Sequence, residues 1–209
     1  MPTIYINNKT DLPERKAYDF YPTPEEFVRC ALTKLKFRVN SFYPFYPESL
    51  LDPGAGTGVW GKVARDVWKG LVDIFGIEIR DDVEPHPCYD GFIRGDFLNW
   101  PVETSSYDLI VGNPPYSLGE EFIEKSWSLL RDGGYLGFLL KLSFLESKKR
   151  YNLYFNGMEH MKPKFVWVSV RRISFTGNKK SNADAYCFVI WEKGWVGKTT
   201  LDWLYWEYD

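Results

Sequence analysis

Short apolar runs alternate with amphipathic stretches along most of the chain. Runs of this kind predict strands at residues 49–52, 72–78, 91–94, 107–111, 135–140, 164–170 and 185–191. Apolar residues recur at helical spacing in residues 27–35, 59–69 and 117–131. Strands that alternate with helices through short turns favour a mainly parallel α/β sheet with helices on both faces. We therefore predict one domain over residues 1–209, which begins with an irregular arm at residues 1–20.

Two of the expected helices begin with capping signals. Thr23 is placed to cap the first helix, Pro24 suits its first turn, and Glu26 completes a capping box. Ser117 and Glu120 stand in the same relation at the start of the helix at 117–131. Both patterns predict where the helices start.

Composition limits the class of protein. Of the 209 residues, 44% are hydrophobic, which is ample for a packed core. No run approaches the roughly 20 apolar residues of a membrane span, and the N-terminus lacks a secretory signal pattern. Cys30, Cys88 and Cys187 are odd in number and far apart, which indicates reduced thiols and a cytoplasmic protein. His86 lies near Cys88 without a second ligand pair, so no metal site is predicted.

The charge is unevenly distributed. The whole chain has a net charge of -2, but residues 141–180 carry ten Lys and Arg against two acids. This segment is therefore +8 and the remainder -10. A basic block beside an acidic body is typical of a surface for phosphates. The expected phosphate contacts are Lys148, Lys149, Arg150, Arg171 and Arg172.

A glycine-rich turn follows the first expected strand and leads into the helix at 59–69. Its sequence is Asp52-Pro53-Gly54-Ala55-Gly56-Thr57-Gly58. Glycines let the backbone turn sharply and approach a ligand, and the helix offers free N–H groups to an anion. Glu78 ends the next strand, where an acid can accept hydrogen bonds from both ribose hydroxyls. The pattern predicts a nucleoside cofactor, although this spacing alone also admits a dinucleotide.

A second turn, Asn113-Pro114-Pro115-Tyr116, follows the strand at 107–111. The Asn113 side-chain oxygen and the Pro114 carbonyl can accept the two hydrogens of a planar amine, which exposes the nitrogen lone pair. Proline fixes φ and removes a competing donor, and Tyr116 offers a face for stacking. Catalysis would then consist mainly of positioning.

Together the two turns resemble those of the adenine-specific amino-methyltransferases, which use S-adenosylmethionine. The resemblance covers about residues 18–191. It implies the Rossmann-like class I methyltransferase fold, with a mainly parallel seven-stranded sheet in the order 3-2-1-4-5-7-6 and an antiparallel last strand. It also implies methyl transfer to N6 of an adenine flipped out of DNA.

The resemblance assigns further residues to the cofactor. Asp96 would accept from the adenine amino group, and Phe97 would pack on the adenine ring. Asp52 would bind the methionine ammonium directly or through water. The turn that begins at Tyr21 would close over the cofactor. The expected cofactor-binding residues are Tyr21, Thr23, Pro24, Asp52, Gly54, Gly56, Gly58, Glu78, Asp96, Phe97 and Asn113.

At the acceptor side, the resemblance places Phe175 on the face of the flipped adenine opposite Tyr116. The expected catalytic residues are Asn113, Pro114 and Tyr116. The expected substrate-binding residues are Pro115, Tyr116, Phe175, Lys148, Lys149, Arg150, Arg171 and Arg172.

The chain departs from many DNA adenine methyltransferases because it lacks room for a large target-recognition domain. Residues 142–163 form a short insertion at most. Sequence discrimination would come from this insertion, the loop at 174–184, the N-terminal arm or a partner. The acidic, aromatic tail at 192–209 would pack on the body or mediate self-association.

Three alternative functions stay open. RNA is the closest, since single-stranded bases also stack on aromatic rings. Protein glutamine methylation suits an Asn-Pro-Pro-Tyr turn, but that family usually has a helical domain before the glycine motif. A non-catalytic nucleic-acid-binding module would not need the intact cofactor and acceptor turns.

Overall fold

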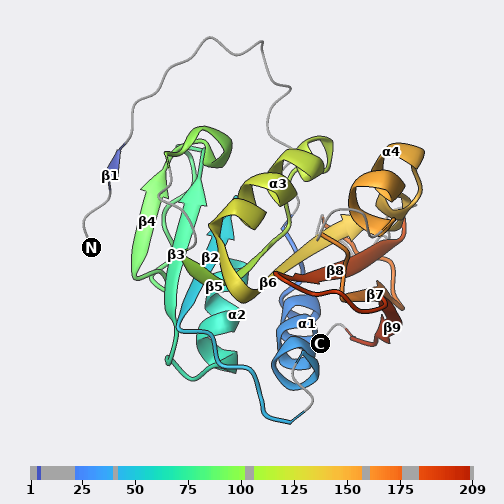
Figure 1. Ribbon diagram of the computed structural model, residues 1–209. Coiled ribbons are helices and arrows are strands. Elements are labelled where there is room, and N and C mark those ends of the chain that lie inside the picture. Colours follow the sequence, from blue (N-terminus) through green and yellow to red (C-terminus); the bar gives the residue numbers. More distant parts are fainter. Residues whose placement is uncertain are drawn as a thin grey trace.

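A central sheet with helices on both faces forms the body of the protein in a computed structural model (Figure 1). The structure describes residues 4–5, 22–39, 42–101, 106–156, 161–175 and 184–207. The strands are β1 (Ile4–Tyr5), β2 (Ser49–Pro53), β3 (Asp73–Glu78), β4 (Gly91–Arg94), β5 (Tyr107–Gly112), β6 (Leu130–Lys141), β7 (Phe165–Ser169), β8 (Tyr186–Glu192) and β9 (Thr200–Leu204). The helices are α1 (Glu25–Arg38), α2 (Val59–Val67), α3 (Gly119–Leu129) and α4 (Lys148–Arg150). Single helical turns are η1 (Phe97–Asn99), η2 (Tyr116–Leu118), η3 (Leu142–Leu145) and the π-type η4 (Tyr151–Phe155).

The strand order is β1-β4-β3-β2-β5-β6-β8-β7-β9. Strand β8 is antiparallel to both β6 and β7, and the other neighbouring strands are parallel. The run from β4 to β7 confirms all seven predicted strands and the implied order 3-2-1-4-5-7-6. The sheet also has an extra strand at each edge. The prediction missed β1 inside the expected irregular arm and β9 inside the tail.

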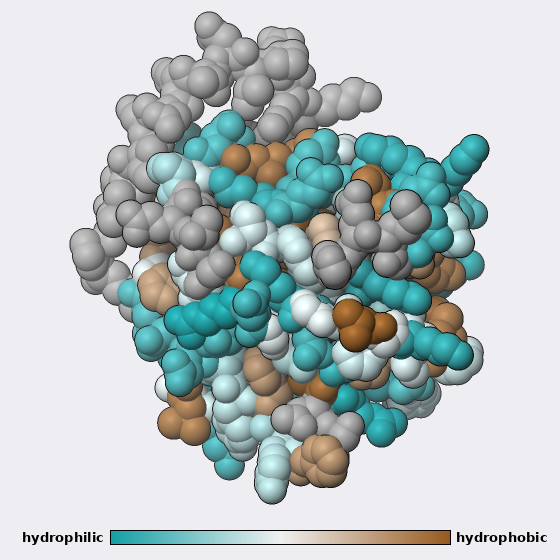
Figure 2. Space-filling view, in the orientation of Figure 1, coloured by the Kyte–Doolittle hydropathy of each residue, from teal (hydrophilic) through white to brown (hydrophobic). Residues whose placement is uncertain are grey.

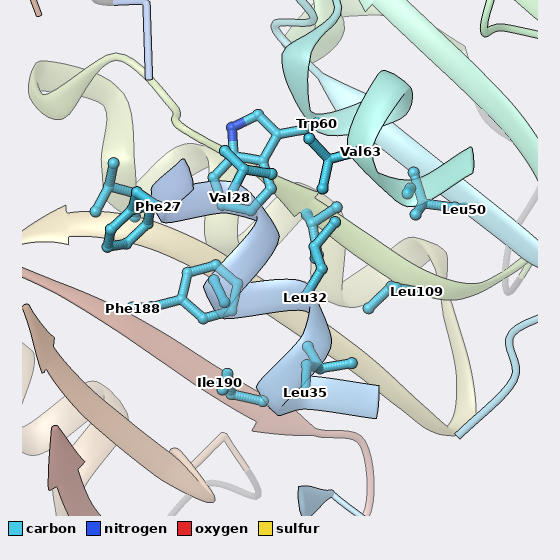
Figure 3. Close-up of a cluster of buried hydrophobic side chains, with 14 of the residues drawn as sticks. Phe27, Val28, Leu32, Leu35, Leu50, Trp60, Val63, Leu109, Phe188 and Ile190 are labelled. Atoms are coloured by element: carbon cyan, nitrogen blue, oxygen red, sulfur yellow. The ribbon is translucent and has the colours of Figure 1, made fainter. Parts of the chain in front are cut away.

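The two faces of the sheet bury different apolar sets. Helix α1 places Phe27, Leu32 and Leu35 against one face, where Leu50 and Leu109 meet them (Figure 3). Helix α3 covers the other face with Phe122, Ile123 and Leu129, which join Leu51 and Ile110. Adjacent residues of a strand point to opposite faces, so Leu50 and Leu51 serve different layers. On the face shown in Figure 2, hydrophilic side chains cover most of the surface.

Both predicted helix starts lie one residue before the observed ones. Helix α1 begins at Glu25, and Pro24 takes the N-cap position, where it has no side-chain acceptor. The Thr23–Glu26 capping box therefore does not form, because Thr23 lies one residue too early. Helix α3 begins at Gly119 with Leu118 as its N-cap, because η2 occupies the preceding residues.

The C-terminal tail packs on the body. Lys34 of α1 donates to Asp202 Oδ2 at 2.7 Å. Leu204 and Trp206 are buried, and the Trp206 ring lies 5.7 Å from that of Phe27. Alternate tail residues therefore bind α1, while self-association through the tail stays a prediction. Within the described residues, no helix is long and apolar enough to cross a membrane.

Candidate active site

The two signature turns lie together at the carboxyl edge of the parallel strands. Strands β2 and β5 are neighbours in the sheet. The strand that follows β2 in the chain lies on one side of this pair, and the strand that follows β5 lies on the other. Ligands of open α/β sheets bind at this kind of switch point. A cavity of about 380 Å³ opens there, a size usual for small-molecule sites. The predicted cofactor-binding residues that line it are Thr23, Gly54, Gly56, Glu78, Asp96, Phe97 and Asn113.

The glycine turn requires its glycines. Gly54, Gly56 and Gly58 have φ values of 77°, 53° and 83°, in the left-handed region that other residues avoid. A Cβ at Gly58 would lie 2.5 Å from the Cβ of His86, so this glycine also makes room for packing. The Gly54 N–H donates to the Ile77 carbonyl at 2.8 Å. The turn is thus held against the end of β3.

Glu78 links the turn to the cavity wall. Its Oε2 accepts from the Gly56 N–H at 2.6 Å, and its Oε1 accepts from the Arg80 N–H at 2.9 Å. The side chain is 4% exposed. Each carboxylate oxygen keeps a second lone pair, so this fixed carboxylate is suited to accept from hydroxyl groups in the cavity. The expected hydrogen bonds from both ribose hydroxyls to Glu78 stay a prediction.

Asp96 and Phe97 both line the cavity, and their expected contacts with the adenine of the cofactor stay a prediction. Asp96 also has a structural task, because its Oδ1 accepts from the Leu98 N–H at 3.0 Å and caps η1. The Phe97 ring lies 4.9 Å from that of Phe122. Asp96 and Phe97 therefore stabilise the local structure and also line the cavity.

Asp52 lies behind the glycine turn. It is fully buried and does not line the cavity, and its expected contact with the methionine ammonium, directly or through water, stays a prediction. The Tyr89 hydroxyl donates to Asp52 Oδ2 at 2.7 Å. Burial raises the pKa of the carboxyl to about 7; the bond from Tyr89 lowers it and the charge of Glu78 raises it. Burial of the Asp52 side chain therefore disfavours its ionised form.

We expect Asp52→Asn to stabilise the protein at pH 8. The pKa of Asp52 is about 7 in the folded state against an ordinary value of 3.8. Between these values the unfolded chain has lost the proton and the folded chain retains it, so wild-type stability falls as the pH rises. The asparagine variant escapes this fall, and its thermal midpoint should exceed that of the wild type by roughly 5–10 °C at pH 8.

Thermal unfolding followed by circular dichroism would check this from pH 4 to pH 8. The difference between the variants should shrink as the pH falls toward 4. A difference that does not change with pH would show that the Asp52 carboxyl titrates normally.

The acceptor turn shares the cavity wall with the cofactor turn. Asn113 and Pro115 line the cavity, and Ser117 follows them on the same wall. A Cβ at Gly112 would lie 3.4 Å from the Pro53 carbonyl oxygen, so the ends of β5 and β2 approach closely. Asn113 therefore lies beside the glycine turn, on the wall of the same cavity.

The remaining predicted residues lie around this wall without lining it. Pro24 caps α1, Gly58 caps α2, and Pro114 and Tyr116 lie on the acceptor turn. Tyr21 lies outside the described residues.

Phe175 does not form a preformed stacking slot with Tyr116. It is 4% exposed, and the two ring centroids are 6.5 Å apart at an interplanar angle of 56°. A base between two rings needs parallel planes about 7–8 Å apart, twice the optimal carbon–carbon separation. Both rings also contact Tyr186, at 5.7 Å from Tyr116 and 5.2 Å from Phe175. Tyr186 was missed, because its sequence position indicates only the start of a strand.

The topology divides the basic segment between the two ends of the strands, the carboxyl ends beside the cavity and the amino ends opposite them. Lys141 is the last residue of β6, and Lys148 and Arg171 follow the ends of β6 and β7, on the side of the cavity. Lys162 and Lys164 precede β7 and lie at the opposite edge, where Lys164 donates to Glu192 Oε2 at 2.5 Å. The prediction of one basic surface over residues 141–180 is therefore wrong. Lys179 and Lys180 lie outside the described residues.

Three of the predicted phosphate contacts are engaged within the protein. Arg150 donates to the carbonyls of Phe144 at 2.7 Å and Glu146 at 2.9 Å, so it fixes the loop before α4. Lys149 pairs with Glu120 Oε2 at 2.5 Å. Arg171 pairs with Glu207 at 3.5 Å across the tail, and Arg172 is exposed. These contacts make Arg150 mainly a structural residue.

The three cysteines are free thiols. In the part of the chain that the structure describes, no group of three or more His, Cys, Asp or Glu side chains could hold a metal ion. The cytoplasmic location expected from the cysteines stays a prediction.

Comparison with known proteins places this site in context. No family model matches the chain. The type II methyltransferase M.CvrRI of Paramecium bursaria Chlorella virus XZ-6E is 29% identical over 182 residues, which are 75% of this chain and 46% of that protein. The chain therefore spans about half the length of this relative.

Solved structures of methyltransferases share the fold. The methyltransferase subunit of a type I restriction-modification system from Streptococcus thermophilus superposes with a TM-score of 0.66 at 16% identity, over 88% of this chain and 47% of that one. A Listeria monocytogenes protein described as a class I S-adenosylmethionine-dependent methyltransferase gives a TM-score of 0.61 at 16% identity, over 87% and 65% of the two chains. These likenesses confirm the predicted fold class.

Proposed function

Because the chain has the class I methyltransferase fold, we propose that it transfers the methyl group of S-adenosylmethionine to the N6 amine of adenine in DNA. The observation that carries the proposal is the shared cavity wall. Asn113 and Pro115 of the acceptor turn line the same cavity as Gly54, Gly56 and Glu78 of the cofactor side. A cofactor in the cavity would therefore lie beside the atoms suited to hold an amine.

The residues of the cavity fit the chemical groups of this cofactor. Glu78 presents a fixed carboxylate for the ribose hydroxyls. Asp96 and Phe97 would meet the adenine. The glycine turn and the N-terminus of α2 would face the carboxylate of the amino-acid part. When bound, the sulfonium supplies an already activated methyl group, so the protein needs no metal or covalent intermediate.

The acceptor turn would prepare the amine. The side-chain oxygen of Asn113 and the carbonyl of Pro114 would accept its two hydrogens and localise the lone pair on nitrogen. Proline holds its carbonyl in a narrow range of backbone angles. These two acceptors orient the nitrogen toward the cavity, which is catalysis by positioning.

Base flipping is part of the proposal. Tyr116 would give the extruded adenine a stacking face, which offsets part of the cost of leaving the duplex. Since Tyr116, Phe175 and Tyr186 now pack on one another, a second stacking face requires these rings to separate. Phe175 and Tyr186 are the candidates for that face.

DNA is favoured by the basic side chains at the carboxyl edge and by the likeness to a restriction-modification subunit. Lys141 ends β6, where it pairs with Asp184 at 2.7 Å, and Lys148 and Arg172 follow strand ends at this edge. RNA is the alternative polymer, because a single-stranded base needs no extrusion from a duplex. Methyl transfer from labelled cofactor to duplex DNA, single-stranded DNA, RNA and protein tests the choice. We expect label in DNA, and label confined to RNA or protein would refute the proposed substrate.

The phosphate contacts have their own test. We expect Lys148→Ala with Lys149→Ala to weaken binding to all duplex sequences alike. Each lost phosphate contact should reduce the slope of log K against log salt by about 0.9. Arg150 is left intact because it holds the loop before α4. Fluorescence anisotropy at several salt concentrations measures the slope.

Lys162→Ala is the matched control, since Lys162 precedes β7 at the opposite edge. It should leave both affinity and slope unchanged. Equal effects of the Lys162 variant and the double variant would show that the carboxyl edge does not bind the backbone.

A further inference from the structure

A tyrosine from the loop between β3 and β4 reaches beneath the glycine turn. Tyr89 is fully buried, and its hydroxyl donates to Asp52 Oδ2 at 2.7 Å. Asp52, near the end of β2, is fully buried as well. Neither residue lines the cavity. The pair therefore lies one layer behind the wall that a cofactor would touch.

Two glycines fix the place of the Tyr89 ring. A Cβ at Gly61 would lie 2.7 Å from Tyr89 Cε1, and a Cβ at Gly76 would lie 2.8 Å from the same atom. Gly61 lies inside α2, where glycine costs about 1 kcal/mol relative to alanine. The ring fills the space that these glycines leave, so the direction of the hydroxyl is set by packing.

The second oxygen of Asp52 lies close to the end of β5, where the acceptor turn begins. Oδ1 has no hydrogen-bond partner among the described residues. It lies 3.4 Å from the Cβ position of Gly112, the residue before Asn113. The carboxyl also receives a backbone hydrogen bond from Gly61 of α2. A buried carboxylate with few donors is costly, so a cationic group near Oδ1 would reduce that cost.

We propose that Tyr89 is a positioning residue for the cofactor, which orients Asp52 so that Oδ1 serves the ammonium group of the amino-acid part through one water. The proposal rests on the proposed function in one respect, that S-adenosylmethionine occupies the cavity. It assigns to Tyr89 no contact with the cofactor itself. Tyr89 would act through its hydrogen bond to the Asp52 carboxylate.

Proton release should accompany binding near neutral pH. Burial raises the pKa of Asp52 to about 7, so the group is partly protonated there. The titratable groups around it are Glu78 on β3 and Tyr89 and Cys88 in the loop before β4. An ammonium at Oδ1 favours the ionised carboxylate, so the proton leaves as the ligand binds.

The test uses calorimetry with two ligands that differ only at the relevant end. S-adenosylhomocysteine has the ammonium, and 5′-methylthioadenosine lacks the amino-acid part. We expect Tyr89→Phe, which keeps the ring, to weaken S-adenosylhomocysteine about tenfold, the value of one hydrogen bond. Its affinity for 5′-methylthioadenosine should stay unchanged. Asp52→Asn should show the same selective loss, and adding Tyr89→Phe to it should cost nothing further.

Wild-type protein gives an independent measurement. Titration with S-adenosylhomocysteine at pH 7 in two buffers of different ionisation enthalpy should show release of a fraction of a proton, and 5′-methylthioadenosine should show none. Equal weakening of both ligands by Tyr89→Phe would overturn the proposal in favour of a merely structural ring. Unchanged affinity for S-adenosylhomocysteine would also overturn it. If the wild type bound neither ligand, the proposed cofactor itself would be wrong.

Discussion

Asn113→Ala should reduce the rate of methyl transfer by roughly a hundredfold to a thousandfold. The affinity for S-adenosylhomocysteine should change little, because the carboxamide serves the target amine more than the cofactor. Asn113 lines the cavity at the end of β5, beside the glycine turn. Its loss would leave the amine with one acceptor at Pro114 and a delocalised lone pair. Single-turnover methylation and calorimetry on the same preparation measure the two quantities.

Ser117→Ala is the control for local damage, since Ser117 lines the same wall without belonging to the expected acceptors. It should turn over at nearly the wild-type rate. Near-normal turnover by Asn113→Ala would remove the acceptor turn from the mechanism.

Glu78→Gln should weaken S-adenosylhomocysteine by roughly ten- to a hundredfold, the loss of one charge-assisted hydrogen bond or more. The carboxylate now accepts from the N–H groups of Gly56 and Arg80. A carboxamide offers only one accepting oxygen, so the turn loses a contact and the ribose loses an acceptor. Calorimetry should show the same loss for 5′-methylthioadenosine, because both ligands have the ribose.

Glu84→Gln supplies the matched control, since Glu84 is an exposed acid in the loop that follows β3. It should bind both ligands like the wild type. A folded Glu78→Gln protein with unchanged affinity would exclude Glu78 from the cofactor site.

The sequence predicted the central sheet because each of its seven strands is a short apolar run between clear turns. It did not predict the edge strands. Strand β1 has two residues, too few for any periodicity, and β9 is Thr-Leu-Asp-Trp-Leu, in which only Leu204 is buried. The capping prediction at Thr23 was wrong because the pattern does not distinguish a cap at Thr23 from one at Pro24.

At the site, local motifs located the residues that belong to the two turns. They could not locate Tyr89 or Tyr186, which are brought in by packing between distant segments. They assigned Asp52 to the ligand directly or through water, but they could not show that the fold buries it behind the turn. Charge counting along the chain grouped Lys148 with Lys164, because a linear count does not register that β7 runs from one edge of the sheet to the other.

The central claim is methylation of adenine N6 in DNA, and nucleoside analysis tests it most directly. Duplex DNA would be incubated with the protein and labelled S-adenosylmethionine, digested to nucleosides and separated by chromatography with mass detection. The account expects the label in N6-methyldeoxyadenosine, and it expects the Asn113→Ala protein to leave that nucleoside unlabelled. Label in a methylated deoxycytidine, or no labelled nucleoside from protein that binds S-adenosylhomocysteine, would contradict it.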